Sequence, residues 1–322
     1  MYDIIFMCDA NASIGFGHAS RCANIAKYLL KSSQNIKIGF MGNYVLEVKK
    51  IIIDILGSID FLSENKRFKA SCIIIDALGD HNDPDILPTV KFDCARKYSK
   101  NLIFLSSGSV IKDLPKDIIC IGYHPSGVNS SSPNIYWSLK YAPTMLSEKK
   151  NFVKRDYSSA LLALGGVKNS TVFDSVVDAL KEIKTIKEVN ILISPVNHNI
   201  NFEYNKKSSY FKTHYNLKSV SPLLYKAGLV IASFGNLSYE ALAHGAPLCL
   251  VGTKKFQAEY GEFLVKEKLV YNAGLIYKYD TKNIFYAINK TINDAKILSK
   301  NGKSKIDGKG IMRQAAIIKQ YI

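Results

Sequence analysis

The sequence lacks several features that define membrane, secreted or disordered proteins. No apolar run approaches the roughly 18–20 residues that a membrane-spanning helix needs. Residues 1–7 contain no basic segment and no small-residue cleavage site, so no signal peptide is expected. With 47% hydrophobic and 22% charged residues, the composition is that of a globular chain, and it excludes disorder, collagen and a coiled coil for the whole molecule.

The sequence also lacks closely paired cysteines and the residue spacing of known metal sites. None of the six cysteines forms a C-x-x-C pair, and several lie in apolar runs, so we predict buried, reduced thiols in a cytosolic protein. A polar cluster of Asp80, His81, Asp83 and Asp85 has the spacing of neither an EF-hand nor a zincin. Neither a metal ion nor a cofactor is therefore expected.

The charge is strongly positive and unevenly distributed. The chain has 43 Lys and Arg against 27 Asp and Glu, a net charge of +16. Residues 1–150 have 18 basic and 14 acidic side chains, and residues 151–322 have 25 and 13, giving net charges of +4 and +12. The basic half could hold a nucleotide diphosphate, rest on an anionic membrane or carry a solvated lysine-rich surface. Nucleic acid is not expected, because the lysines are dispersed and no zinc-finger or RRM signature appears.

The order of apolar runs predicts two α/β domains. At 322 residues and 35.9 kDa, the chain suits two domains of about 150 residues. Short apolar runs alternate with helical periodicity, which indicates parallel sheets covered on both faces. The charged segment Ser147–Arg155 is the expected linker, and a strand, a glycine loop and a helix follow one another in both halves. We therefore predict Rossmann-like, doubly wound domains over residues 1–150 and 151–322, facing each other across a cleft.

Ligands in such sheets bind beyond the carboxyl ends of the strands, where three loops stand out. The first, Asp9–Arg21, contains Gly15 and Gly17 and places His18 at the start of a helix. The helix dipole favours a neutral imidazole there, which can act as a base. The third glycine position of a G-x-G-x-x-G motif holds Ser20, so a nicotinamide cofactor is not supported. The alternative is a loop histidine with a purely structural hydrogen bond.

The other two loops lie in the second half. Gly165 and Gly166 follow a strand and precede a helix, where backbone N–H groups could hold a diphosphate, although a simple turn fits as well. The third loop, Ser233–Asn236, opens a helix that carries Glu240, whose carboxylate could accept both ribose hydroxyls or simply be solvated. Gln257 is a further candidate sugar contact.

Several of these segments resemble one family. "CDANASIGFGHASRCANIAKYL" is similar to the N-terminal signature R-x-D-x-S-x-x-I-G-x-G-H-x-x-R-C of the PseG/SpsG-like UDP-sugar hydrolases of pseudaminic acid biosynthesis. "LGGVKNST", "ASFGNLSYEALAHGAPLCLV", "FQ" and "IDGKGIMR" resemble later blocks of that family, in the same order and over nearly the whole chain. The glutamate block is shared with MurG-like glycosyltransferases.

This resemblance implies a GT-B fold whose C-terminal domain binds the nucleotide of a UDP-sugar and whose N-terminal domain carries a histidine that positions or activates water. That histidine corresponds to His18. The implied reaction removes UDP from a UDP-(diacetamido-trideoxy)-hexose. The matching segments supply the candidate substrate-binding residues Gly15, Gly17, Arg21, Asp76, Tyr141, Gly165, Gly166, Ser233, Gly235, Asn236, Leu237, Glu240 and Gln257.

The sequence also departs from the family pattern, mostly at charged positions on the sugar side. Met7, Lys168 and Phe256 replace the family's Arg, Asp and Asn. Other departures are Ser106-Ser107-Gly108 for an Asp-Asp pair, Ala77-Leu78 for His-Tyr, and the missing Arg after Tyr141. A changed sugar or acceptor fits this pattern. We expect a cytoplasmic hydrolase. The alternatives are a GT-B glycosyltransferase for surface glycans, with a sugar or lipid-linked acceptor and peripheral contact with the inner face of the membrane, and a non-catalytic binding protein.

Overall fold

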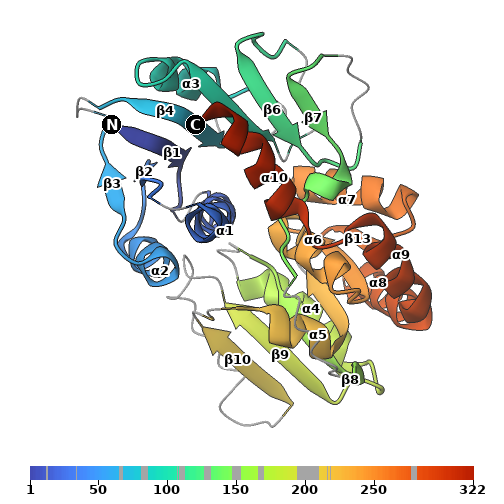
Figure 1. Ribbon diagram of the computed structural model, residues 1–322. Coiled ribbons are helices and arrows are strands. Elements are labelled where there is room, and N and C mark those ends of the chain that lie inside the picture. The colour runs from blue at the N-terminus through green and yellow to red at the C-terminus, as the bar shows by residue number, and fades with distance from the viewer. Residues whose placement is uncertain are drawn as a thin grey trace. The chain divides into compact units, whose positions relative to one another are not determined.

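A computed structural model describes most of the chain. The described residues are 1–11, 14–33, 35–64, 68–80, 86–106, 108, 113–126, 132–146, 154–165, 170–193, 210–215, 217, 219–276 and 281–322. They form two compact units (Figure 1). Unit 1 comprises Met1–Pro143 and Lys309–Ile322, and unit 2 comprises Thr144–Gly308.

Unit 1 contains a seven-stranded parallel sheet. Its order is β3-β2-β1-β4-β5-β6-β7. The strands are β1 (Tyr2–Cys8), β2 (Ile38–Met41), β3 (Asp60–Leu62), β4 (Ala70–Asp76), β5 (Asn101–Ser106), β6 (Ile118–Gly122) and β7 (Ile135–Trp137). The helices are α1 (Gly17–Ser32), α2 (Leu46–Leu56), α3 (Thr89–Arg96) and α10 (Gly310–Ile318), with short 3₁₀ turns at Leu139–Tyr141 and Lys319–Tyr321.

The core of unit 1 follows from its apolar strands. Residues 4–8 of β1 are at most 1% exposed, because the strand lies inside the sheet and is covered on both faces. Ile5 and Ile73 pack with Phe92 and Ala95 of α3 on one face. Successive side chains of a strand point to opposite faces, so Phe6 lies on the other face.

Helix α10 completes unit 1 rather than unit 2. It packs against α1, and the amide of Gln314 donates to the carbonyl of Tyr141 at 2.6 Å. Gly310 lies so close to the chain at Ala142 that a Cβ would fall 1.7 Å from that carbonyl oxygen. Unit 2 begins at Thr144, near the predicted boundary after residue 150, whereas residues 309–322 of the predicted second domain join unit 1.

Unit 2 contains a six-stranded parallel sheet. Its order is β10-β9-β8-β11-β12-β13. The strands are β8 (Asp156–Ala163), β9 (Glu188–Ile193), β10 (Phe211–Tyr215), β11 (Ala227–Ala232), β12 (Leu248–Gly252) and β13 (Tyr271–Leu275). The helices are α4 (Ser170–Lys181), α5 (Ser221–Lys226), α6 (Asn236–Ala243), α7 (Lys255–Lys266), α8 (Thr281–Asn293) and α9 (Ala295–Lys305).

Helices α4 and α8 cover one face of this second sheet. Leu162 and Ile231 of the sheet pack with Val177 and Ile284 of the two helices. The predicted single helix over Asn283–Lys300 is interrupted at Asp294, giving α8 and α9. Among the described helices, none is both long and apolar enough to cross a membrane. The predicted α/β class with two parallel-sheet domains is confirmed.

Candidate functional site

The carboxyl ends of two neighbouring strands bring the candidate residues of unit 1 together. Cys8 at the end of β1 is paired in register with Asp76 at the end of β4. Helix α1 begins at Gly17, just beyond β1, so His18 lies in its first turn. Arg21 follows three residues later, and residues three apart in a helix share a face. Local sequence order thus directs both side chains toward Asp76.

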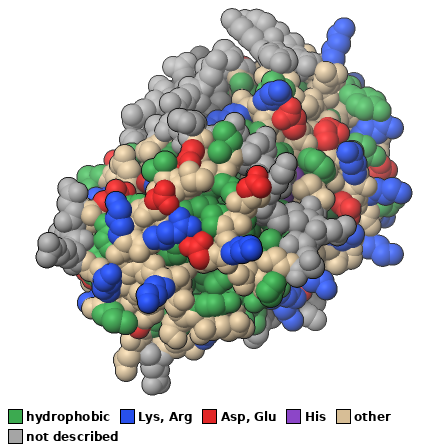
Figure 2. Space-filling model, turned by 90° about the horizontal axis from the view of Figure 1, so that it is seen from above, with side chains coloured by type: hydrophobic (Ala, Val, Ile, Leu, Met, Phe, Trp, Pro, Cys, Tyr) green, Lys and Arg blue, Asp and Glu red, His purple; other side chains and the backbone are tan. Residues whose placement is uncertain are grey.

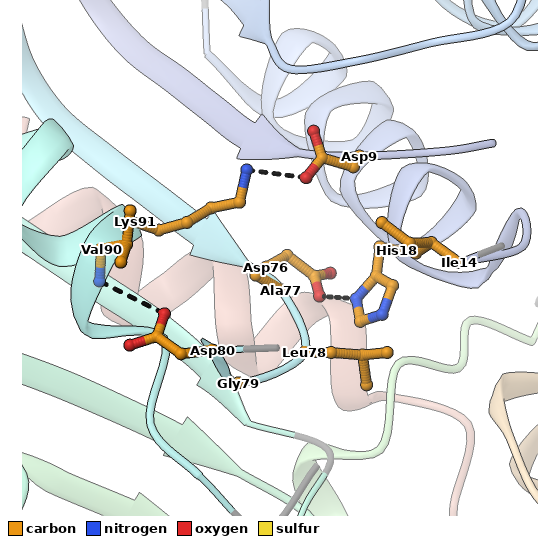
Figure 3. A pocket seen from close by; sticks show the side chains of 10 residues that line it. All are labelled: Asp9, Ile14, His18, Asp76, Ala77, Leu78, Gly79, Asp80, Val90 and Lys91. Atoms are coloured by element: carbon orange, nitrogen blue, oxygen red, sulfur yellow. Dashed lines mark hydrogen bonds and ion pairs between the residues drawn. The ribbon is translucent and has the colours of Figure 1, made fainter. Parts of the chain in front are cut away.

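The three side chains form a buried, hydrogen-bonded cluster (Figure 3). His18 Nδ1 lies 2.5 Å from Asp76 Oδ1, and Arg21 Nε donates to Asp76 Oδ2 at 2.5 Å. Arg21 Nη2 also donates to Asp76 Oδ1, so the guanidinium holds both carboxylate oxygens. The thiol of Cys22 lies 3.5 Å from Oδ2. The exposed fraction is 0% for the side chain of Asp76 and 2% for that of Arg21.

Electrostatics keep Asp76 and Arg21 ionised. Burial favours the neutral acid, but the charge of Arg21 and the hydrogen bonds from His18 and Arg21 outweigh it and lower the pKa of Asp76 to about 2. Burial opposes the charge of Arg21, whereas Asp76 raises the pKa of its guanidinium. An ionised carboxylate only accepts hydrogen bonds, so Nδ1 of His18 carries the proton. In the neutral imidazole, Nε2 is then the unprotonated nitrogen.

His18 opens onto a pocket of about 340 Å³ within unit 1. The side chain of His18 is 11% exposed, and Nε2 lies on the side of the ring away from Asp76 (Figure 3). No described residue forms a hydrogen bond with Nε2. The residues around the pocket are Asp9, Ile14, His18, Asp76, Ala77, Leu78, Gly79, Asp80, Val90 and Lys91. The imidazole can therefore accept a proton from a molecule bound there.

An ion pair that the sequence did not predict lines the same pocket. Lys91 of α3 contacts Asp9 Oδ2 at 2.7 Å, and the other oxygen of Asp9 accepts from the backbone of Asn43 at 2.8 Å. Asp80 belongs to the polar cluster noted in the sequence, and its carboxylate accepts hydrogen bonds from the backbone of Thr89 and Val90 at the start of α3. Its expected partners His81, Asp83 and Asp85 lie outside the described residues.

The remaining candidates of unit 1 surround the cluster or lie apart from it. Gly15 has a φ of +92°, a backbone conformation that favours glycine, and donates to Asn11 at 2.8 Å. Gly17 begins α1, whose N-cap residue offers no side-chain cap. The ring of Tyr141 contacts that of Tyr136, and its carbonyl accepts from Gln314, so Tyr141 belongs to the contact with α10.

In unit 2, the ends of β8 and β11 are linked beside the glycine loop. Ser233 donates its hydroxyl to the carbonyl of Leu164 at 3.2 Å. Gly165, which follows, has a φ of +66°. Its neighbour Gly166 and the substituted position Lys168 lie outside the described residues. The link places the loops after two neighbouring strands at the same edge of the sheet.

Helix α6 starts in that same loop region. Gly235 donates its N–H to the hydroxyl of Ser238, and Ser238 returns its N–H to the Gly235 carbonyl at 3.0 Å. Asn236 and Leu237 form the first turn of the helix. Glu240 follows one turn later, and it is half-buried. Among the described residues, none donates a hydrogen bond to its carboxylate. Burial raises the pKa of Glu240 to about 7.

Gln257 has a structural role that its sequence position did not reveal. Its Oε1 accepts from the backbone of Thr253 and Lys254, both at 3.1 Å, and from the Thr253 hydroxyl at 2.7 Å. These bonds cap α7. Only the amide nitrogen of Gln257 is left to donate to a ligand.

No protein-family model matches the chain. Curated relatives at 24% identity include the uncharacterized protein MJ1062 of Methanocaldococcus jannaschii, over 82% of this chain, and the spore coat polysaccharide biosynthesis protein SpsG of Bacillus subtilis, over 52%. The alignments cover 58% and 51% of those proteins, so the chain spans about half the length of the curated relatives it matches. The homology to SpsG is weak and extends over half of this chain.

Solved structures of glycosyltransferases share the fold. The kitacinnamycin glycotransferase matches with a TM-score of 0.64 at 11% identity, over 99% of both chains. The spinosyn rhamnosyltransferase SpnG, complexed with thymidine diphosphate, matches with a TM-score of 0.63 at 10% identity, over 98% of this chain and 100% of its own. MurG of Acinetobacter baumannii matches with a TM-score of 0.62 at 10% identity, over 99% of both chains. The expected GT-B fold class is thereby confirmed.

Proposed function

We propose that the chain is an enzyme that cleaves a nucleotide sugar, with water as the acceptor. The observation that carries this proposal is the buried Arg21–Asp76 pair, which holds Nδ1 of His18 and leaves Nε2 facing a pocket. A histidine oriented in this way by a carboxylate is suited to act as a general base. The resemblance of the surrounding motif to UDP-sugar hydrolases supports the same assignment.

The proposed step is balanced by one proton transfer. Nε2 of His18 takes a proton from a water molecule while the water oxygen forms a bond to the anomeric carbon. The bond between that carbon and the diphosphate oxygen breaks, and the nucleoside diphosphate leaves with the electron pair. Asp76 remains ionised and stabilises the imidazolium that forms. Such base catalysis contributes about 10²–10⁴-fold to a rate.

We assign nucleotide binding to unit 2. Gly165, with a φ of +66°, and the start of α6 lie beyond the carboxyl ends of neighbouring strands, the edge at which parallel α/β sheets bind ligands. Lys254 and Lys255, at the start of α7, can add positive charge. No described residue donates a hydrogen bond to the carboxylate of Glu240, which can accept two ribose hydroxyls.

We propose a UDP-(diacetamido-trideoxy)-hexose of nonulosonic acid biosynthesis, or a close variant, as the substrate. The support is the motif resemblance, together with a relative whose name places it in spore coat polysaccharide biosynthesis. The Lys91–Asp9 pair supplies both a donor and an acceptor beside the apolar side chains of Ile14 and Leu78. A sugar that carries both hydroxyl and methyl groups fits such a lining.

A glycosyltransferase is the second candidate. Several of the solved structures that share the fold are glycosyltransferases, and the net charge of +12 over residues 151–322 suits an enzyme working near a membrane. In that case a hydroxyl of a sugar or a lipid-linked acceptor takes the place of water, and His18 removes its proton.

Release of UDP separates the candidates. The protein is incubated with a panel of UDP-sugars, with and without sugar acceptors, and UDP is quantified. Equal release in both arms is the expected result, and release only with an acceptor identifies a transferase. His18→Ala should slow release by about 10²–10⁴-fold. His214→Ala, at a histidine hydrogen-bonded to Asn190 of β9, should leave release unchanged. Absence of UDP release from every sugar would overturn the enzyme proposal in favour of a binding protein.

A further inference from the structure

Helices α8 and α9 present a basic outer surface that the proposed reaction does not use. Their inner sides are anchored by residues such as Ile284, Ile288 and Leu298, which are at most 5% exposed. The exposed residues of the two helices include six lysines: Lys282, Lys290, Lys296, Lys300, Lys303 and Lys305. We call this surface the α8–α9 basic face.

Few carboxylates offset this charge. Within residues 281–305 the only acidic residue is Asp294, and its carboxylate accepts a hydrogen bond from the hydroxyl of Tyr271. Lys305 is paired with Glu267 at 2.8 Å. No ion pair holds the other five lysines among the described residues. Their combined field therefore attracts an extended anionic surface.

Large apolar side chains are exposed among these lysines. Tyr286 is 64% exposed, Ile297 61% and Phe285 41%. The ammonium of Lys290 lies 5.6 Å from the centre of the Tyr286 ring. Both helices lie at the right-hand edge of Figure 1, and the same edge in Figure 2 shows many Lys and Arg side chains together with hydrophobic and a few acidic ones.

We propose that the α8–α9 basic face binds the surface of an anionic lipid bilayer. Lysines attract acidic headgroups, and exposed aromatic and aliphatic side chains enter the boundary between headgroups and acyl chains. This combination favours a bilayer over a nucleic acid, because a phosphate backbone offers no apolar region into which Ile297 and Phe285 could insert. The proposal is independent of the reaction assigned to His18.

Sedimentation with vesicles tests this proposal. The probes are vesicles of phosphatidylcholine alone and vesicles of two parts phosphatidylcholine to one part phosphatidylglycerol. The full chain should bind the second kind only, and bind less as salt shortens the Debye length from about 10 Å at 0.1 M to about 3 Å at 1 M. Each lysine near the surface is worth roughly fivefold in affinity. The triple variant Lys290→Glu, Lys296→Glu and Lys300→Glu should therefore lose at least roughly two orders of magnitude.

A matched variant controls for net charge. Lys50→Glu, Lys97→Glu and Lys100→Glu change the same number of exposed lysines in unit 1 and should leave most of the binding. Ile297→Ser with Tyr286→Ser should weaken binding without changing the charge. Circular dichroism checks that each variant is folded. The proposal is wrong if both triple variants lose binding equally, if neutral vesicles bind as well, or if a nucleic acid duplex displaces the vesicles.

Discussion

At the scale of single residues, His18 and Asp76 have separable roles. His18 faces the pocket, whereas Asp76 is wholly buried and holds Arg21. His18→Ala should lower turnover by about 10²–10⁴-fold. Because the substitution removes no buried ionised group, it should change the free energy of unfolding by only about 1 kcal/mol. Steady-state kinetics and urea unfolding measure the two effects.

Asp76→Asn should lower both activity and stability. The substitution leaves the buried guanidinium of Arg21 without its counter-charge, which costs about 3–5 kcal/mol. Asp117→Asn is the control, since that exposed carboxylate pairs with Arg96 at 2.8 Å and should cost about 1 kcal/mol at most. The pKa of Asp76 is lowered in the folded state, so its stabilisation is present above its unfolded pKa of about 4 and is lost as the pH falls toward 2. Similar acid unfolding of wild type and Asp76→Asn would contradict this role.

Glu240 should make nucleotide binding depend on pH. Burial raises its pKa to about 7, and ribose hydroxyls that donate to its carboxylate favour the ionised form. Affinity for UDP should therefore rise as the pH increases through 7, with release of a proton on binding. Calorimetry in buffers of different ionisation enthalpy measures both, and Glu240→Gln should abolish the dependence.

The stability of unit 2 supplies an independent check on Glu240. A carboxyl group whose pKa is raised by folding contributes stability below its unfolded pKa, and that contribution is lost as the pH rises through 7. Glu240→Gln should thus be more stable than wild type at pH 8 and similar at pH 4. If the difference in the free energy of unfolding between Glu240→Gln and wild type is the same at pH 4 and pH 8, the carboxylate is solvated.

The sequence indicates the candidate residues but not all of their contacts. His18 and Glu240 are candidates because strand ends and helix starts carry ligand-binding residues in parallel sheets, and Asp76 is a candidate through the family resemblance. The Lys91–Asp9 pair could not be predicted, because it joins residues 82 positions apart through tertiary packing alone. In the sequence Gln257 is a candidate contact of the sugar, and only its hydrogen bonds in the structure show that it caps α7.

At the scale of elements, the packing of α10 depends on Gly310. A Cβ at this position would fall 1.7 Å from the carbonyl oxygen of Ala142, so Gly310→Ala forces the helix away from unit 1. The expected cost is about 1–3 kcal/mol, measured by urea unfolding. Met312→Ala, at a half-exposed position of the same helix, should cost only about 0.5 kcal/mol. Equal effects would mean that close approach at Gly310 is unimportant.

Which elements could be predicted depended on their apolar patterns. Buried central strands such as β1 and β11 are continuous apolar runs in the sequence, so the sequence predicts them. The short edge strands β3 and β7 have only three residues each, too few for a period to appear. The break between α8 and α9 at Asp294 has no Gly or Pro to mark it, and the helical periodicity continues across it.

At the scale of the whole molecule, the fluorescence of the single tryptophan reports on the unfolding of unit 1. Trp137 lies in β7 of unit 1, where its indole donates to the carbonyl of His124 at 3.1 Å. Ile73→Ala in β4 should lower the unfolding midpoint seen by Trp fluorescence, because such a cavity costs about 2–5 kcal/mol.

The matched substitution in the other core is Ile231→Ala in β11. It should shift the transition seen by circular dichroism and leave the fluorescence midpoint in place. A fluorescence midpoint lowered by Ile231→Ala would mean that the two units unfold as one cooperative body.

The return of α10 to unit 1 has a consequence for biosynthesis. The chain leaves unit 1 after Pro143 and re-enters it at Lys309, so all of residues 144–308 are translated before the first sheet receives its last helix. Domains usually complete folding in the order in which they emerge from the ribosome. In this chain the order is inverted. Unit 2 can complete its folding first, because unit 1 still lacks α10 when residues 144–308 have been translated.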